Sequence, residues 1–124
     1  MTALLDSSGW IELLSDSGRA ELFEPVLDCE RLIVPSIVRY EVGRYALIHM
    51  GEAGHFLALR ALSKFDEAPL DGSIADAAVI LGKAHNLAMA DAIIYATAQV
   101  SGAELWTQDQ HFQDLAGVRF FHKT

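Results

Sequence analysis

The stretch from Ala88 to Ala98, AMADAIIYATA, decides the fold, because it is apolar on nearly every side and carries one acidic residue near its start. Its length and alanine content predict a helix, and its lack of a clean polar face predicts that the helix is buried. Asp91 then lies in or near the first turn, where the helix dipole and free N–H groups favour negative charge. Asp91 either caps this helix or shares a site with other carboxylates.

Short apolar segments alternate with helical patterns along the rest of the chain. Strands are expected at residues 2–5, 31–34, 104–107 and 118–121, with a weak edge strand at 68–70. The helical patterns cover residues 7–15, 19–27, 35–51, 52–65 and 73–85. We expect Pro35 and Ser73 to begin the helices at 35–51 and 73–85, and a turn at residues 51–54 to pair the helices at 35–51 and 52–65. This order predicts an α/β sandwich around a mostly parallel sheet.

The composition limits which classes of protein the chain can belong to. The 124 residues are 52% hydrophobic, which suits one domain over residues 1–124 with its own core. Every apolar run is interrupted before the length of a membrane span, and the N-terminus has no basic region ahead of an apolar one. The single cysteine, Cys29, cannot form an internal disulfide. Together these absences predict a cytoplasmic protein without a membrane partner.

The formal net charge of −8 is unfavourable for a nucleic-acid partner, because such proteins usually carry a basic surface. A set of acids that share one metal ion removes part of this difficulty. The bound cation cancels negative charge at the point where a phosphate must approach.

Four acidic residues occupy positions that can meet at one edge of the sheet. Asp6 ends the first expected strand, and Asp109 follows the strand at 104–107 closely. Glu41 lies on the helix entered from the second strand, and Asp91 starts the buried helix. Since ligands gather beyond the carboxyl ends of parallel strands, we expect the four to converge. Close carboxylates cannot all stay ionised without a cation, which favours a hard divalent metal.

Each acid also has a simpler interpretation. Asp6 can cap the helix at residue 7, and Asp109 can cap a short turn. Glu41 among apolar residues is rare unless it is paired, and its partner could be Arg39, Arg44 or Arg60.

The segments around these acids resemble the PIN-domain ribonucleases, and within them the VapC-type toxins of bacterial toxin–antitoxin pairs. LLDSS at residues 4–8 is similar to the family's opening strand and acid, with Ser7 where threonine is commoner. SIVRYEV at 36–42 resembles its helix with a glutamate. MADAIIYATA at 89–98 and TQDQHF at 107–112 are similar to its two later motifs. The resemblance covers nearly the whole chain and implies a three-layer α/β/α PIN-like sandwich with four to five strands.

The resemblance also implies metal-assisted hydrolysis of RNA. Mg²⁺ or Mn²⁺ would be held by Asp6, Glu41, Asp91 and Asp109, with one or two ions activating a water for attack on phosphorus. Glu41 or Asp91 is the candidate acceptor of the water's proton. Ser7 and Thr107 are candidate hydrogen-bonding partners of the phosphate or of the acids. Single-stranded or looped RNA is the expected substrate, because its backbone can bend into such a site.

A homodimer and a cognate antitoxin are implied as partners. Antitoxins of this kind lay an apolar segment into a groove between the early helices. The residues expected to line that groove are Trp10, Leu13, Leu14, Val42, Tyr45, Phe56 and Leu59.

Two other functions are compatible with parts of the sequence. One is a catalytically silent PIN-fold binding module, which is disfavoured because all four acids are present. The other is a phosphoryl-transfer protein with Asp6 as nucleophile, but Ser8 stands where haloacid-type phosphatases need a second aspartate. The five histidines lack metal-ligand spacing and are interpreted as surface or packing residues. His111 is the exception to watch, since it follows Asp109 by two positions.

Overall fold

Five strands form one parallel sheet in the order β3-β2-β1-β4-β5. The computed structural model describes residues 1–123, so the last residue of the predicted domain, Thr124, lies outside the described residues. The strands are β1 (Thr2–Leu5), β2 (Arg31–Pro35), β3 (Asp66–Ala68), β4 (Glu104–Thr107) and β5 (Val118–Phe120). The predicted parallel sheet is confirmed, and its five strands match the upper end of the four to five expected.

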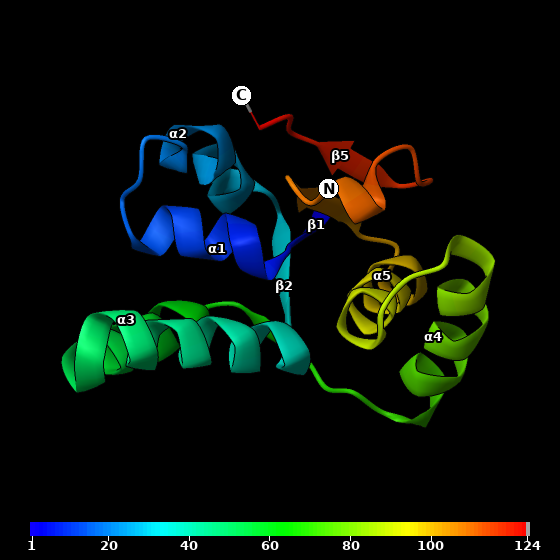
Figure 1. Cartoon of the computed structure of the whole chain (residues 1–124), viewed down its shortest axis with the longest axis horizontal. Coiled ribbons are helices and arrows are strands. Elements are labelled where there is room, and N and C mark those ends of the chain that lie inside the picture. Colours follow the sequence, from blue (N-terminus) through cyan, green and yellow to red (C-terminus); the bar gives the residue numbers. More distant parts are fainter. Residues whose placement is uncertain (124) are drawn as a thin grey trace.

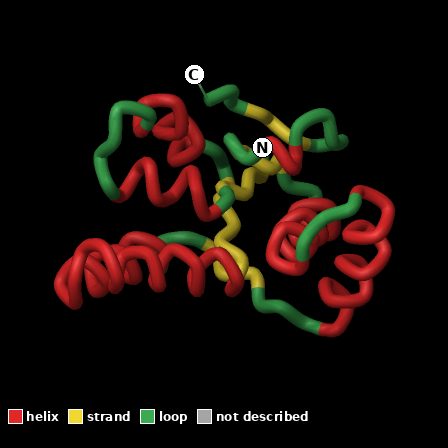
Figure 2. Tube along the Cα trace, viewed as in Figure 1, coloured by secondary structure: helices red, strands yellow, loops and turns green. Residues whose placement is uncertain are grey.

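Helices cover both faces of this sheet. Figure 1 shows α1, α2 and α3 on one side of the strands and α4 and α5 on the other, and Figure 2 shows the yellow strands between the two groups of red helices. The helical elements are α1 (Ser7–Leu14), α2 (Ala20–Phe23), the 3₁₀ turn η1 (Glu24–Asp28), α3 (Ser36–Leu62), α4 (Gly72–His85), α5 (Met89–Ser101) and the 3₁₀ turn η2 (Gln110–Phe112). The predicted three-layer α/β/α sandwich is confirmed.

The core surrounds the central strand β1, in which Ala3, Leu4 and Leu5 have no exposed surface. The apolar stretch at 88–98 forms most of α5, as predicted, and Tyr95 and Ala98 pack into the same core. Gly102, with a φ of 64°, ends this helix in a left-handed conformation. α5 therefore holds its first turn in a fixed position beside the carboxyl ends of the strands.

The chain reverses direction inside α3, at Gly51. Gly51 has a φ of 72° and a ψ of −176°, which interrupts the helical backbone. The halves on either side lie against each other, because a Cβ on Gly43 would be 3.6 Å from His55 Nε2 and from Leu59 Cδ2. The expected antiparallel helix pair is confirmed, and Gly51 alone makes the turn while Gly54 lies within the second half.

Four local expectations differ from the structure. Pro35 is the last residue of β2 and precedes α3, which begins at Ser36. The helix expected at 19–27 divides into α2 and η1, because Pro25 interrupts it. Asp71, rather than Ser73, caps α4 by accepting a hydrogen bond from the backbone N–H of Ile74 at 3.0 Å. The edge strand runs over residues 66–68 instead of 68–70 and ends before Pro69.

The residues expected to line one antitoxin groove do not form a single surface. Trp10 and Val42 are only 2% and 1% exposed and belong to the core, whereas Phe56 is 59% exposed. Trp10, Leu13 and Leu14 nevertheless line one hollow together. Leu59 lines a second hollow with Tyr40, and Tyr45 lines a third.

Within residues 1–123, no single helix has both the length and the hydropathy needed to cross a membrane. The pair α4 and α5 reaches both only when its two helices, bent by 113° to each other, are counted together.

Candidate active site

Asp6 lies at the carboxyl end of β1 and is held by hydrogen bonds to both carboxylate oxygens. Oδ1 accepts from the backbone N–H of Gly9 at 3.0 Å and from Ser8 Oγ at 2.9 Å, so Asp6 caps α1. Oδ2 accepts from the hydroxyl of Thr107, which ends the neighbouring strand β4. The residue is only 4% exposed. The capping interpretation of Asp6 is therefore correct, and the structure adds a cross-strand contact to it.

Burial changes the proton affinity of Asp6. Removal of the carboxyl group from water raises its pKa from 3.8 to about 6, although the hydrogen bonds from Thr107, Gly9 and Ser8 oppose the shift. The nearby charge of Asp109 raises the pKa a little further. A carboxylate in this position gains from a cation placed next to it.

Glu41 reaches the same place from the first half of α3. Ser7 Oγ donates a hydrogen bond to Glu41 Oε1 at 2.6 Å, which ties the start of α1 to α3. None of the ion pairs between described residues includes Glu41, so the three arginines considered as its partners do not neutralise it. Arg44 and Glu41 line the same surface hollow but form no ion pair with each other.

Asp91 and Asp109 meet at a histidine. Asp91 lies in the first turn of α5, and Asp109 caps η2 by accepting a hydrogen bond from the backbone N–H of His111 at 2.9 Å. His111 Nδ1 is 3.0 Å from Asp91 Oδ2 and 3.4 Å from Asp109 Oδ1. Burial raises the pKa of Asp91 against the lowering effect of His111, while the hydrogen bond with Asp91 and the two negative charges raise the pKa of His111.

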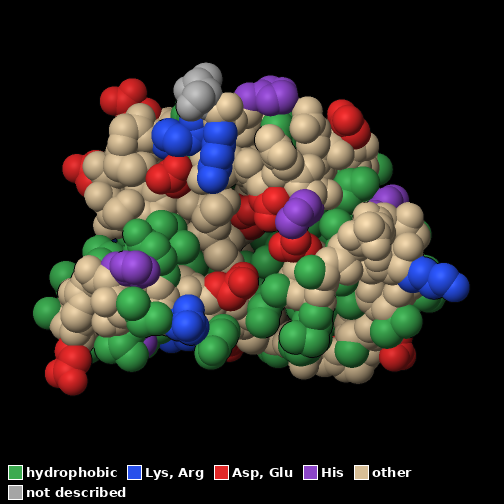
Figure 3. Space-filling view, viewed as in Figure 1, with side chains coloured by type: hydrophobic (Ala, Val, Ile, Leu, Met, Phe, Trp, Pro, Cys, Tyr) green, Lys and Arg blue, Asp and Glu red, His purple; other side chains and the backbone are tan. Residues whose placement is uncertain are grey.

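All four acids line one hollow of about 580 Å³ at the carboxyl ends of the strands. They come from the β1–α1 junction, α3, α5 and the loop after β4. In Figure 3, acidic side chains gather at the centre of this face, with one histidine side chain directly beside them and other histidine and basic side chains farther out. The other residues that line the hollow are Ser7, Ser8, Ile11, Tyr40, Arg44, Tyr45, His49 and Ile94.

The two hydroxyl residues expected to form hydrogen bonds at the site do so. Ser7 and Thr107 each donate a hydrogen bond to one of the acids, Glu41 and Asp6 respectively. Sequence reasoning named Arg44 only as a possible partner of Glu41 and did not find His49, since nothing in their local pattern shows that α3 turns both toward the hollow. His111 was marked by its spacing from Asp109, but its contact with Asp91 depends on how α5 packs.

This arrangement suits a divalent cation. Four carboxylates with polar neighbours provide the hard oxygen ligands that Mg²⁺ and Mn²⁺ prefer. Burial is the main cause of the raised pKa values of Asp6 and Asp91, and the charge of Asp109 is a smaller one. A cation beside these carboxylates would favour their ionised forms.

Comparison with protein families gives a match to the PIN domain over residues 3–118. Comparison with curated proteins gives no match. Among solved structures, the chain is similar to a toxin–antitoxin complex from Klebsiella pneumoniae, with 28% identity, a TM-score of 0.84, and coverage of 98% of this chain and 99% of that chain.

Two further structures have the same fold at lower identity. VapC20 of Mycobacterium tuberculosis, a toxin that cleaves the sarcin–ricin loop, is 14% identical with a TM-score of 0.77, covering 94% of this chain and 95% of that one. VapBC2 of Rickettsia felis, bound to a DNA fragment from its promoter, is 14% identical with a TM-score of 0.78 and 98% coverage of both chains. At this identity the likeness shows the fold alone.

Proposed function

Because the chain belongs to the PIN domain family, we propose that it is a metal-dependent ribonuclease that acts as the toxin of a toxin–antitoxin pair. The observation that carries the proposal is the hollow lined by Asp6, Glu41, Asp91 and Asp109. Residues from four separate elements converge there, which is more than the capping of individual helices requires. The proposed unit is one PIN domain over residues 1–124, acting in the cytoplasm.

The four acids are the proposed ligands of Mg²⁺ or Mn²⁺, directly or through water. When bound, the ion supplies a water of lowered pKa and a positive charge for the phosphate. Asp6 is a rigid ligand, because three donors fix its carboxylate. Ser7 orients Glu41 in the same way from α1. Both contacts hold oxygen atoms in place before substrate binds.

The proposed reaction is hydrolysis of an RNA phosphodiester. A water oxygen attacks phosphorus, the bond from phosphorus to the 3′ oxygen breaks, and Glu41 or Asp91 accepts the proton of the attacking water. Arg44 lies in the hollow with these acids, where its charge favours the phosphate backbone. The role of phosphorylated nucleophile is disfavoured for Asp6, because Ser8 stands where a haloacid-type phosphatase needs a second aspartate and donates a hydrogen bond to Asp6 Oδ1 instead.

Cleavage of RNA tests this function. We expect the purified protein to cut single-stranded or looped RNA in Mg²⁺ or Mn²⁺ and not in EDTA. Asp6→Asn and Asp91→Asn should each lower the rate at least about 100-fold, because each removes one charged ligand. Asp76→Asn is the matched control, since Asp76 is an exposed acid on α4. Full cleavage by either site variant would overturn the proposal. A wild-type protein that cuts no RNA, with or without added metal, would favour a silent binding module.

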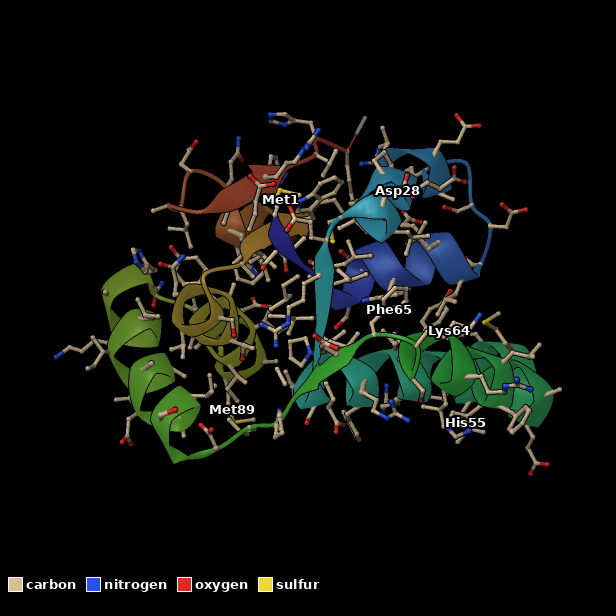
Figure 4. The ribbon with its side chains drawn as sticks, turned by 180° about the vertical axis from the view of Figure 1, so that it is seen from behind. Met1, Asp28, His55, Lys64, Phe65 and Met89 are labelled. Carbon is tan, nitrogen blue, oxygen red and sulfur yellow. The ribbon has the colours of Figure 1, made fainter. Side chains whose placement is uncertain are left out.

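An antitoxin is the proposed protein partner, as in the similar Klebsiella pneumoniae complex. A hollow of about 540 Å³ lies between α1, η1 and the end of α3, and its apolar lining includes Leu13, Leu14 and Phe65. Figure 4 shows Phe65, Lys64 and Asp28 around this region. Leu14→Glu should weaken co-purification with the co-expressed cognate antitoxin, because it puts a charge into the apolar hollow.

A homodimer is proposed through α4 and the start of α5. Val79, Ile80 and Met89 are 72%, 71% and 76% exposed, and this much apolar surface is unusual on a monomer. Figure 4 shows Met89 at the beginning of α5, far from the hollow beside Phe65. Val79→Glu should give a monomer by light scattering and leave antitoxin binding intact, which is the reverse of the result expected for Leu14→Glu.

A further inference from the structure

His111 brings a nitrogen atom to the two acids at the edge of the hollow. Its Nδ1 lies 3.0 Å from Asp91 Oδ2 and 3.4 Å from Asp109 Oδ1. Its backbone N–H also donates to Asp109 Oδ1, which fixes that oxygen beside the ring. Among residues 1–123, these three form the one group of histidine, cysteine or acidic residues whose donor atoms all lie within 4.8 Å of one another.

The spacing of these atoms is that of neighbouring ligands around one ion. An octahedral ion that binds its ligands at about 2.1 Å holds adjacent ligand atoms about 3 Å apart. The distances of 3.0 and 3.4 Å from Nδ1 to the two carboxylate oxygens are close to this value. The side chain of His111 is 70% exposed, so an ion from solvent reaches Nδ1 without a rearrangement of the core.

We propose that His111 binds the divalent ion through Nδ1, beside Asp91 and Asp109, and so makes the site prefer Mn²⁺ to Mg²⁺. This inference rests on the metal-dependent function proposed above and adds a nitrogen ligand beside two of its four acids, Asp91 and Asp109. Both ions bind carboxylate oxygen well, but Mn²⁺, a first-row transition metal, accepts an imidazole nitrogen more readily than Mg²⁺ does. One histidine therefore sets which ion occupies the site.

The same contacts also describe a plain ion pair, in which His111 competes with the metal for Asp91. The two roles predict opposite effects on metal affinity when His111 is removed. Removal of a ligand weakens metal binding, whereas removal of a competing cation strengthens it. Metal affinity therefore separates them without any measurement of RNA cleavage.

The first experiment is pulsed electron paramagnetic resonance on the wild-type protein with Mn²⁺ alone. A directly bonded imidazole nitrogen gives a ¹⁴N coupling, which changes to a ¹⁵N coupling when the histidines carry ¹⁵N. We expect this coupling in the wild type and its loss in His111→Ala. His49→Ala is the matched control, because His49 is an exposed histidine that lines the same hollow without contacting the acids. It should keep the coupling.

The second experiment titrates Mn²⁺ and Mg²⁺ into the same proteins by calorimetry. For His111→Ala we expect the Kd for Mn²⁺ to rise at least about tenfold, which is the lower end of the loss when a residue at a metal site is removed. The Kd for Mg²⁺ should change less, so the preference for Mn²⁺ falls. His49→Ala should match the wild type in both titrations.

The possible results distinguish a failure of the His111 ligand role from a failure of the proposed nuclease function. Mn²⁺ bound without nitrogen coupling, or bound more tightly by His111→Ala, overturns the ligand role of His111 and leaves the nuclease proposal standing. A wild-type protein that binds neither ion overturns both. Where His111→Ala fails to fold, a wild-type coupling that persists in His49→Ala still assigns the nitrogen to His111, because His49 is the histidine that lines the hollow itself.

Discussion

Thr107 donates its hydroxyl hydrogen to Oδ2 of Asp6, although the two residues are 101 positions apart in the sequence. The contact crosses the β1–β4 pair, in which Leu5 is opposite Trp106, so the two residues follow paired positions at the same end of the sheet. The sheet register thus places a neutral donor against the most buried of the four acids.

Replacement of Thr107 by valine tests the strength of this contact. Thr107→Val keeps the shape of the side chain and removes the donor, and Thr107 is fully buried. We expect a loss of about 1 to 3 kcal/mol in the free energy of unfolding and a rise in the pKa of Asp6, because the hydrogen bond from Thr107 lowers it. Urea unfolding and carboxyl ¹³C chemical shifts measure the two effects.

The control for this substitution is Thr97→Val. Thr97 is 2% exposed and donates to the backbone carbonyl of Ile93 within α5, so it is equally buried but has no contact with Asp6. An unchanged pKa of Asp6 in Thr107→Val would contradict the assigned contact.

Stability should depend on pH through Asp6. Its pKa is about 6 in the folded protein against 3.8 as the ordinary value, so the folded state binds this proton more tightly than the unfolded state. The stabilisation is complete below about pH 4 and is lost as the pH rises through about 6, by about 3 kcal/mol at 1.4 kcal/mol per pKa unit. Urea unfolding in EDTA from pH 4 to pH 7 measures this loss.

Asp6→Asn cannot ionise, so its stability should rise relative to the wild type as the pH increases across this window. A constant difference between the two proteins would show that Asp6 does not titrate there. Added Mn²⁺ should restore stability to the wild type at pH 7, because it binds the folded state.

The close packing of α1 on β1 depends on Gly9. A Cβ at this position would lie 2.3 Å from Leu5 Cδ1 and 2.9 Å from Leu5 Cγ. Gly9→Ala should therefore cost about 1 to 3 kcal/mol, by displacing Leu5 or the helix start whose N–H binds Asp6. Thermal unfolding measures the loss. Gly72→Ala is the control, because nothing lies within 4 Å of its Cβ, and equal loss in both variants would contradict the packing argument.

Ser7→Ala isolates the orientation of Glu41. The variant loses the 2.6 Å hydrogen bond to Glu41 Oε1 while all four acids remain. We expect RNA cleavage to slow about 10- to 100-fold, which is typical when a residue that supports a metal ligand is removed. Ser15→Ala removes a serine hydroxyl at the far end of α1 and should cleave normally. Wild-type rates in Ser7→Ala would show that Glu41 needs no such support.

Most of the fold was predictable, because local pattern and chain connectivity agree. The apolar run at 88–98 can only be buried, and strands that alternate with helices lead to a parallel sheet. The prediction of a single helix over residues 19–27 was wrong, because Pro25 lacks the N–H for a helical hydrogen bond and the segment continues as a 3₁₀ turn. At the start of α4, Asp71 and Ser73 are both good capping residues, and their sequence alone does not rank them.

The convergence of the four acids was predictable because Asp6 and Asp109 follow strands, Asp91 starts a helix, and Glu41 lies on the helix entered from the second strand. The finer contacts did not follow. Ser7 and Glu41 are 34 positions apart, and their hydrogen bond depends on the angle at which α1 crosses α3. His111 meets Asp91 only because η2 folds back over the first turn of α5. Such contacts are set by tertiary packing, which no local pattern records.

The central claim is that these four carboxylates bind a divalent ion. The most direct measurement is an anomalous difference map from crystals soaked in Mn²⁺. We expect a peak within bonding distance of the carboxylates of Asp6 and Asp91, and near Glu41 and Asp109 directly or through water. A fully soaked crystal with no peak in this hollow would contradict the proposed metal site.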